Sequence, residues 1–381
     1  MTRRAGGTME ALGRTVELQV EVLRERSAVT GLEGEWNALA ASARAPVFLR
    51  HEFILAWLDN FAPQRTWRVC TARDGEGALL AVLPLVEQRT HLCGVPVLEL
   101  AGAANAHSCR FDLLCMPGAE REVASALDAF LAAGRHDVLR LPDVPEGGAA
   151  RALYERAAAR GAPVGAWPSQ DSPYFPLPRT WEALEQSLDA RFRANLRRRR
   201  RKLASQGELQ LQRVEGGAQL DAALEEGLLL EATGWKGRNG TAMAQDRSTR
   251  DFYVELAHVA AARGWLALYL LRVQGRAVGF HYALAYEGRY LLLKPAYDEQ
   301  VAACSPGQLL VEDVARDGVS RGWTEFDFLG PDMTWKRDWT SARRHHDWLY
   351  VFRDTRLGRA LASAKFRLVP AAREVVDRWK R

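Results

Sequence analysis

One stretch decides the fold, residues 265–330, with the sequence WLALYLLRVQGRAVGFHYALAYEGRYLLLKPAYDEQVAACSPGQLLVEDVARDGVSRGWTEFDFLG. Its first part holds three β-rich runs separated by two-residue turns at 274–275 and 287–288, a spacing that predicts an antiparallel meander of three strands. The residues after 305 place apolar side chains at helical spacing, and 323–329 alternate like a strand. The predicted order is therefore three strands, a helix and a fourth strand.

The predicted helix has a clear beginning. Ser305 suits the N-cap, Pro306 the first helical position, and Gln308 the return partner of a capping box. A helix N-terminus just past the end of a strand can bind a phosphate, because unpaired backbone N–H groups and the helix dipole point at it. A closed capping box would use the N–H groups of Ser305 and Gln308 and leave only that of Gly307. A phosphate site and an ordinary cap both stay open.

Length and composition indicate a globular protein of two domains. The chain has 381 residues, which exceeds the usual size of a single core. No apolar run approaches the roughly 20 residues that cross a bilayer, so we expect a soluble cytoplasmic protein without a membrane span. Five scattered cysteines without a Cys-x-x-Cys pair predict reduced thiols and no metal site. A net charge of +5 favours anionic partners weakly, and coenzyme, nucleotide, phospholipid and RNA remain open.

The order of predicted elements repeats along the chain. Helix, hairpin, further strand, helix and strand follow one another in the first half, and the same succession returns in the second. Residues 168–178 contain four prolines and form the natural joint. We therefore expect an α/β fold of two similar units in tandem, with a divergent first domain at 16–167, a linker at 168–178, a second domain at 179–355 and a basic C-terminal helix at 356–381.

Two cationic segments stand out. Residues 191–203 carry eight positive charges, while their apolar residues fall near one helical face. Such a helix could present a solvated surface, bind nucleic acid or hold a phosphorylated small substrate. The loop 234–241 has three glycines together with Lys236 and Arg238. It could be a lid over a ligand or an exposed turn.

Several stretches resemble one known family: 192–203, Phe252-Tyr253, Leu256-Ala257 before Gly264, the hairpin 273–278, Tyr297-Asp298, SPGQLL at 305–310, FDFLG at 326–330, and Trp335-Lys336 followed by Trp339. They resemble the GNAT-superfamily acyltransferase domain of CelD-like proteins of cellulose biosynthesis, which is itself similar to FemAB-type peptidyltransferases. The resemblance is closest over about residues 170–355 and vaguer over 16–165.

The resemblance implies a tandem pair of GNAT folds, each a mixed, mostly antiparallel sheet flanked by helices. It implies an acyl-CoA donor, most simply acetyl-CoA, and N-acyl transfer to an amine. Leu293, Lys294 and Pro295 would then line the acyl-pantetheine arm, and the turn Ser305-Pro306-Gly307-Gln308 would meet the pyrophosphate. This turn departs from the better-known glycine-rich GNAT phosphate loop, and FemAB-type relatives take aminoacyl-tRNA as donor instead.

Amine acylation needs a base to deprotonate the ammonium and hydrogen-bond donors for the tetrahedral oxyanion. Asp327 alternates with two phenylalanines and is the candidate base, although a structural carboxylate paired with Lys336 or Arg337 explains it at least as well. Lys336 could hold a donor phosphate or a substrate carboxylate, or be a surface charge. Tyr297 could protonate the departing thiolate or simply pack at the strand end. His281 is expected to be an interior histidine.

Three hypotheses about function follow. The first is an N-acyltransferase that moves an acyl group from acyl-CoA to a small amine or an envelope polysaccharide precursor. The second is a FemAB-like transferase that uses aminoacyl-tRNA and binds tRNA through the arginine run. The third is a catalytically silent accessory protein of polysaccharide production, because a fold alone does not fix a function.

Overall fold

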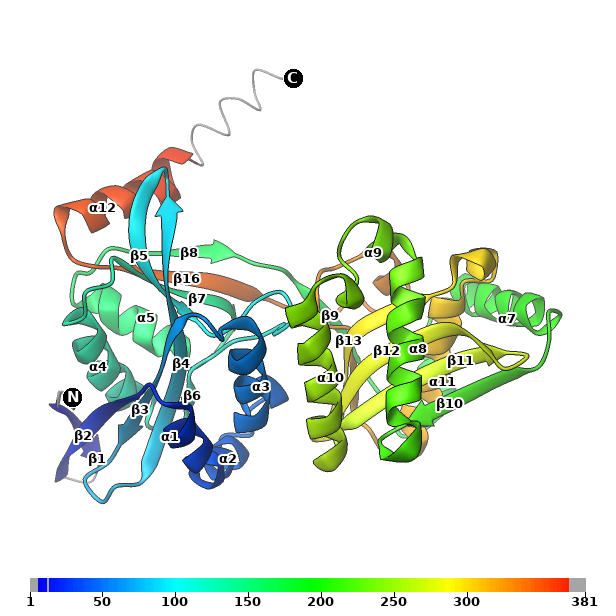
Figure 1. Cartoon of the computed structure of the whole chain (residues 1–381), viewed down its shortest axis with the longest axis horizontal. Helices are drawn as coiled ribbons and strands as arrows, with labels where there is room; N and C mark the ends of the chain where they lie inside the picture. Colours follow the sequence, from blue (N-terminus) through cyan, green and yellow to red (C-terminus); the bar gives the residue numbers. More distant parts are fainter. Residues whose placement is uncertain (1–5, 12–13, 370–381) are drawn as a thin grey trace. The chain divides into compact units, whose positions relative to one another are not determined.

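The computed structural model describes residues 6–11 and 14–369, and the chain divides into two units, each built around its own sheet (Figure 1). The first unit comprises the chain up to Gln170 together with the residues from His345 onward. The second unit comprises Asp171–Arg344. Each unit is described by itself.

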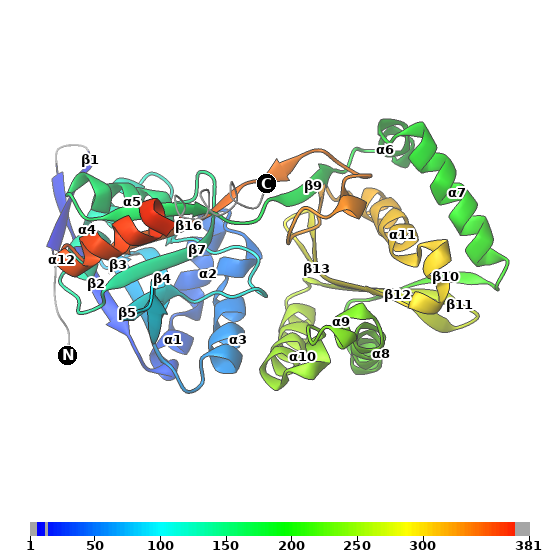
Figure 2. The same ribbon diagram turned by 90° about the horizontal axis from the view of Figure 1, so that it is seen from above.

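The first unit contains a nine-stranded sheet in the order β1-β2-β3-β4-β5-β7-β16-β8, with β6 paired to β4. Helices α4 and α5 cover one face, and α1, α2 and α3 the other (Figure 2). The strands are β1 (Gly6–Ala11), β2 (Arg14–Leu23), β3 (Thr66–Arg73), β4 (Leu79–Leu92), β5 (Val95–Gly102), β6 (Leu114–Cys115), β7 (Val138–Pro145), β8 (Val164–Pro168) and β16 (His346–Phe352). The helices are α1 (Arg26–Gly31), α2 (Glu33–Ser42), η1 (Val47–Leu49), α3 (His51–Phe61), α4 (Glu120–Ala132), α5 (Ala150–Ala159), α12 (Arg356–Ser363) and η6 (Ala364–Leu368).

The second unit contains a seven-stranded sheet in the order β10-β11-β12-β13-β14-β9-β15. Helices α8 and α10 lie on one face, and α7 and α11 on the other (Figure 2). The strands are β9 (Ser172–Pro176), β10 (Leu209–Val214), β11 (Leu266–Val273), β12 (Arg276–Tyr286), β13 (Arg289–Tyr297), β14 (Glu325–Asp327) and β15 (Arg343–Arg344). The helices are α6 (Trp181–Ser187), α7 (Ala190–Ala204), η2 (Gly217–Gln219), α8 (Leu220–Thr233), α9 (Trp235–Arg238), η3 (Met243–Gln245), α10 (Arg247–Ala262), η4 (Glu299–Cys304), α11 (Pro306–Ser320) and η5 (Thr334–Lys336).

The predicted meander is confirmed. Strands β11, β12 and β13 pair antiparallel in succession. Both connecting turns have two residues at positive φ, Gln274 (49°) with Gly275 (78°) and Glu287 (48°) with Gly288 (72°). Successive positive φ values define the type I′ turn, whose twist matches that of the strands it joins. Helix α11 and strand β14 then follow as expected.

Each sheet contains one parallel pair within an otherwise antiparallel arrangement. In the first unit β5 pairs parallel with β7, and α4 is the helix between them in the chain. In the second unit β13 pairs parallel with β14, and α11 connects them. A parallel pair requires such a crossover. The same succession of meander, helix and parallel strand occurs in both units, as the repeated order of elements predicts.

The capping box predicted at the start of α11 is wrong. Pro306 does occupy the first turn, but Ser305 adopts a left-handed conformation (φ 50°, ψ 57°) and its side chain makes no capping hydrogen bond. The amide of Gln308 donates to the carbonyl of Ser305 at 3.0 Å. The Gln308 side chain bonds Trp335 and Trp339 instead, so the box does not form.

The strands that complete each sheet come from the segments where the chain passes between the units. Strand β9 lies inside the proline-rich stretch 168–178 and pairs with β14 and β15. Strand β16, which follows the second unit in the chain, pairs with β7 and β8 of the first. Of the C-terminal segment 356–381, α12 and η6 are described, and residues 370–381 lie outside the described part of the chain. None of the described helices is long and apolar enough to span a bilayer.

Candidate functional site

The parallel strands β13 and β14 stay paired over only a short distance. Their register joins Arg289 to Glu325, Tyr290 to Phe326 and Leu291 to Asp327, where β14 ends. Strand β13 continues to Tyr297 and pairs with β12 on its other side. A bulge sets Leu293 as an extra residue between two register positions of that pairing. Within the described strands, the second half of β13 therefore lacks a ladder partner on the β14 side, which is where an extended ligand can bind backbone groups.

The N-terminus of α11 lies beside the end of β13. A Cβ atom on Gly307 would come within 3.6 Å of Cδ1 of Tyr297, so the tyrosine ring packs against the first turn of the helix. The helix runs from Pro306 to Ser320, long enough for its dipole to act at this end. The structure thus brings together two groups of residues singled out in the sequence, the end of β13 and the turn at 305–308.

The side chain of Gln308 joins α11 to the loop that follows β14. Its Nε2 donates to the carbonyl of Trp335 at 3.0 Å, and its Oε1 accepts from Nε1 of Trp339 at 2.5 Å. Gln308 is only 9% exposed. Its side chain therefore holds the loop against the helix N-terminus and does not close a cap.

Lys336 tethers the same loop from within. The side chain is 4% exposed, and its Nζ donates to the carbonyls of Leu329 (2.6 Å) and Pro331 (2.9 Å). Leu329 has a left-handed backbone (φ 48°), and the lysine holds the carbonyl of that residue. The idea that Lys336 is a surface charge is wrong, because the ammonium group is buried among backbone carbonyls.

Asp327 is fully buried at the end of β14 and pairs with Arg344. Its Oδ2 accepts from Nη1 of Arg344 at 2.8 Å, and its Oδ1 accepts from the amide of Leu329 at 2.9 Å. The guanidinium of Arg344 also bonds Glu325 and lies 3.7 Å from the ring centroid of Tyr174. The structural interpretation of Asp327 expected Lys336 or Arg337 as its partner, whereas the structure pairs it with Arg344. The alternation of Glu325 and Asp327 on one strand face was the available signal for a doubly bonding arginine.

The loop 234–241 is fixed to the end of β13. Nζ of Lys236 donates to the carbonyl of Pro295 and to Oε1 of Glu231, both at 2.7 Å. Glu231 is 2% exposed. Arg238 bonds both carboxylate oxygens of Glu299, at 2.9 and 3.0 Å. The loop is therefore attached to β13 and η4, and its residues 238–241 are exposed, as in an exposed turn.

Lys294 and His281 lie on opposite faces of the sheet. Lys294 directs its Nζ to within 5.4 Å of the ring centroid of Tyr253 in α10. His281 is 1% exposed, and its Nδ1 lies 3.1 Å from the hydroxyl of Tyr290. Burial, helped by the charge of Lys236, lowers the pKa of His281 to about 3. The expectation of an interior histidine is confirmed, and the ring is neutral at ordinary pH.

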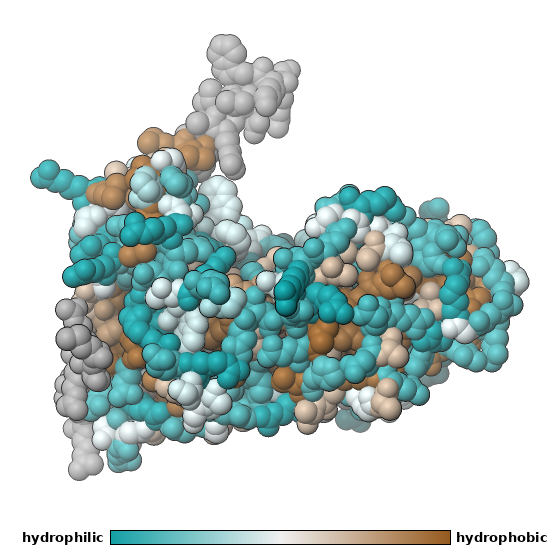
Figure 3. Space-filling view, in the orientation of Figure 1, coloured by the Kyte–Doolittle hydropathy of each residue, from teal (hydrophilic) through white to brown (hydrophobic). Residues whose placement is uncertain are grey.

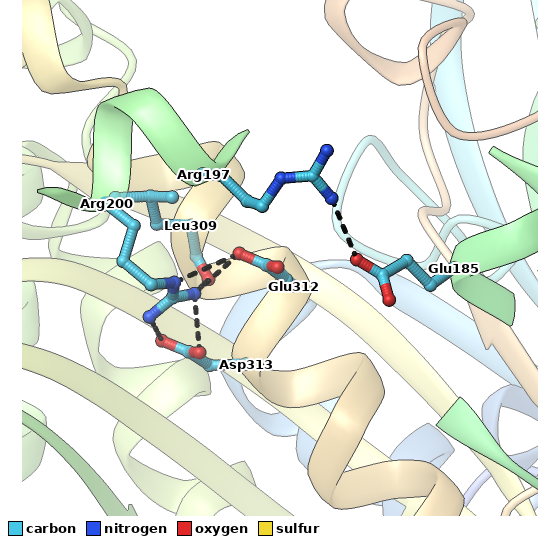
Figure 4. A network of polar contacts seen from close by, with 6 residues as sticks. All are labelled: Glu185, Arg197, Arg200, Leu309, Glu312 and Asp313. Atoms are coloured by element: carbon cyan, nitrogen blue, oxygen red, sulfur yellow. Dashed lines mark hydrogen bonds and ion pairs between the residues drawn. The ribbon is translucent and has the colours of Figure 1, made fainter. Parts of the chain in front are cut away.

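The arginine run forms α7, and its two faces differ (Figure 4). On the inner side Arg200 bonds Glu312 and Asp313 of α11, each at 2.7 Å. Arg197 reaches Glu185 at 3.4 Å and is 61% exposed. The exposed cationic residues of the helix share its outer face: Arg191, Arg197, Arg198, Arg201 and Lys202. Across residues 6–11 and 14–369, no group of three or more His, Cys, Asp or Glu side chains is placed to hold a metal ion.

The arrangement of β13, α11 and β14 coincides with a known domain. Residues 190–337 match the family model of the acetyltransferase (GNAT) domain. This part of the chain is therefore similar to a GNAT-type acyltransferase domain. The domain begins in α7 and ends directly after Lys336, so it includes the bulged strand, the N-terminus of α11 and Asp327. No curated protein matches the chain in sequence.

Three solved structures share the fold at low sequence identity. One is described as FemX, with a TM-score of 0.56 and 12% identity, covering 84% of this chain and 96% of that one. Another is L-PGS from Bacillus licheniformis, with a TM-score of 0.53 and 12% identity, over 89% of this chain and 96% of that one. A third is the C-terminal domain of a putative lysylphosphatidylglycerol synthetase from Agrobacterium fabrum, with a TM-score of 0.51 and 12% identity, over 90% and 96%. Each extends over most of both chains, which confirms the tandem GNAT-like fold.

Proposed function

We propose that the protein is a cytoplasmic N-acyltransferase that moves an acyl group, most simply acetyl, from acyl-CoA to the amine of a small metabolite or of an envelope or polysaccharide precursor. The observation that carries the proposal is the match of residues 190–337 to the GNAT domain. The same residues contain the place where β13 continues beyond its pairing with β14 and meets the N-terminus of α11. The second unit carries the reaction, and the first is a divergent copy of the same fold.

The donor lies along β13 in this proposal. Leu293, Lys294 and Pro295 line the acyl-pantetheine arm, since the bulge turns this part of the strand away from regular pairing. The turn formed by Ser305, Pro306, Gly307 and Gln308 receives the pyrophosphate at the positive end of the α11 dipole. Gly307 has no side chain, so its backbone is the part of the turn that the pyrophosphate approaches most closely. The side chain of Gln308 keeps the neighbouring loop in place.

The chemical roles are assigned by position. Tyr297 packs against the first turn of α11, where the pyrophosphate is placed, so its ring lies beside that end of the donor. Asp327 is the base, positioned by its bond to Arg344 at the end of β14. Lys336 shapes the loop after β14 through the carbonyls of Leu329 and Pro331. Asp327 takes a proton from the amine, whose nitrogen bonds to the acyl carbon while the thioester C–S bond breaks, and the leaving thiolate takes up a proton from water.

The proposal is tested by incubating the protein with acetyl-CoA and a panel of amino sugars, amino acids and polyamines while the release of free CoA thiol is measured. We expect amine-dependent release that Asp327→Asn lowers by at least about a hundredfold, the usual contribution of a general base. Glu325→Gln is the matched control, because it removes the other carboxylate bonded to Arg344. An unaltered rate in Asp327→Asn would remove that residue from the mechanism.

A second candidate is a transferase that takes its acyl group from aminoacyl-tRNA. The observation that favours it is the cationic outer face of α7, together with the shared fold of FemX and of the lysylphosphatidylglycerol synthetase domain. Filter binding of tRNA at several salt concentrations separates the two donors. Binding that weakens steeply with salt and in Arg198→Gln/Arg201→Gln supports tRNA. A chain that releases CoA thiol and binds no tRNA excludes this candidate.

A further inference from the structure

The positive charge of the chain is concentrated in its C-terminal segment. Residues 356–381 hold eight basic and two acidic residues, a net charge of +6. The whole chain has a net charge of +5, so the remaining residues together carry −1. The same segment contains leucine, valine, phenylalanine and tryptophan between its charges. A short basic segment with interspersed apolar residues is typical of helices that contact membrane surfaces.

The described part of this segment is anchored to the first sheet by one side only. Leu361 is 3% exposed and belongs to a cluster with Val138, Tyr350 and Phe352. Phe366 packs so closely on the backbone of Gly165 that a Cβ atom there would come within 2.3 Å of its ring. These contacts fix which face of α12 and η6 is turned inward.

Two further apolar side chains of this segment are exposed. Leu357 is 43% exposed and Leu368 is 64% exposed. Among the residues that the structure describes, five large hydrophobic side chains are exposed, and these two belong to the short stretch of α12 and η6. The first unit therefore shows apolar surface around α12 (Figure 3). In water such leucines cost free energy that burial in a lipid interface recovers.

Basic side chains accompany the exposed leucines. Arg356 and Arg367, next to Leu357 and Leu368 in the chain, are exposed. Arg359 bonds Asp354 at 2.6 Å, so its charge is partly compensated within the first unit. An anionic headgroup layer would meet Arg356 and Arg367 while the two leucines enter the acyl boundary beneath it.

We propose that α12 and η6 form a docking surface that lies flat on an anionic phospholipid bilayer. A polyanion such as RNA would satisfy the arginines but leave both leucines in water. A second copy of the chain would cover the leucines but set two segments of net charge +6 against each other. An anionic bilayer satisfies both features at once. The proposal is independent of the donor used by the second unit.

Vesicle co-sedimentation of the full chain tests the proposal. The vesicles are phosphatidylcholine alone, or phosphatidylcholine with about 30 mol % phosphatidylglycerol, an anionic lipid that attracts basic segments. We expect strong binding to the mixed vesicles and little to the neutral ones. Raising the salt to about 0.5 M, where surface charges are screened, should weaken binding without abolishing it, because the leucines contribute independently.

Matched variants assign the binding to this surface. Leu357→Gln/Leu368→Gln should lower the partition coefficient about tenfold, and Arg356→Gln/Arg367→Gln about fivefold. The control for apolar exposure is Leu229→Gln on α8, since Leu229 is also 64% exposed. The control for charge is Arg191→Gln/Arg198→Gln on α7. All these residues are exposed, so the fold should be retained, which circular dichroism checks.

Several results would overturn the proposal. Equal binding to neutral and anionic vesicles would overturn it, and so would a loss of binding only in the α7 variant. So would complete loss of binding at high salt without any effect of the leucine changes, or displacement of the vesicles by RNA at equal charge. A chain that forms dimers through Leu357 and Leu368 and binds no vesicle would show that a second copy covers this face.

Discussion

At the residue scale, the ion pair between Asp327 and Arg344 fixes the position of the carboxylate proposed as base. Asp327 is completely buried, whereas Arg344 keeps 28% of its side chain exposed. A buried carboxylate that loses its cation pays a large desolvation cost. The arginine therefore compensates the buried carboxylate of Asp327 and closes the end of β14.

Removing this arginine should destabilise the second unit. Arg344→Ala is expected to lower the free energy of unfolding by about 3 kcal/mol, since it leaves the buried carboxylate of Asp327 without its cation. Arg343→Ala is the neighbouring control. Arg343 pairs with Asp332 at 2.8 Å near the surface, and its loss should cost less than about 1 kcal/mol. Urea denaturation measures both values, and equal losses would contradict the assigned difference.

The buried histidine gives a pH dependence. The pKa of His281 is about 3 in the folded chain because of burial, while an unfolded histidine titrates near 6.5. The unfolded state therefore binds the proton more tightly, and stability is lost as pH falls below about 6.5, with a slope of up to about 1.4 kcal/mol per unit. His281→Gln should flatten this slope. Burial lowers the pKa of His136 to about 4, so this residue adds to the same loss of stability at low pH. The slope left in His281→Gln can be compared with the contribution expected from His136. An identical slope in His281→Gln would show that the folded ring takes up the proton.

At the element scale, α7 is attached to α11 through one arginine of its run. Arg200→Ala should lower the free energy of unfolding by about 2 kcal/mol, because Glu312 and Asp313 lose a charged hydrogen-bond donor. Arg198→Ala on the outer face should change it by less than about 0.5 kcal/mol. Thermal unfolding of the two variants compares them directly, and similar Tm values would mean that the inner bonds contribute nothing.

The sequence predicted the elements of the second unit well where local signals were strong. The meander was predictable because its turns use two-residue segments with glycine at positive φ, and α11 because its apolar spacing is regular. The left-handed Ser305 was not predictable, since its conformation follows from η4 directly before it. Strand β9 was hidden because Pro173 and Pro176 suggest a linker, although its pairing with β14 and β15 uses other residues of the strand as donors.

At the scale of the whole molecule, the sequence could indicate two units but not how the chain completes their sheets. Strand β16 pairs with β7 across about 200 residues of intervening chain. No local sequence pattern predicts a strand partner at that separation, since the pairing of β16 with β7 depends on where the second unit begins and ends. The candidate site followed the same rule. Asp327, Tyr297 and Gly307 were found by motif, whereas Arg344 and the bonds of Lys236 to Pro295 and Glu231 required the structure.

The central claim is that the second unit binds acyl-CoA at the N-terminus of α11. Thermal-shift titration with acetyl-CoA, free CoA and ATP tests it most directly, because a ligand present at 100 times its Kd adds about 2.7 kcal/mol to the stability of the folded state. Two variants sharpen the measurement. Gly307→Ala fits the space beside Tyr297, whereas Gly307→Glu sets a negative charge at the proposed pyrophosphate position.

The account predicts a saturable rise in Tm with acetyl-CoA and with CoA, larger than with ATP, that is retained in Gly307→Ala and lost in Gly307→Glu. A chain that melts cooperatively and shows no shift with any acyl-CoA, or the same shift in Gly307→Glu, would contradict it.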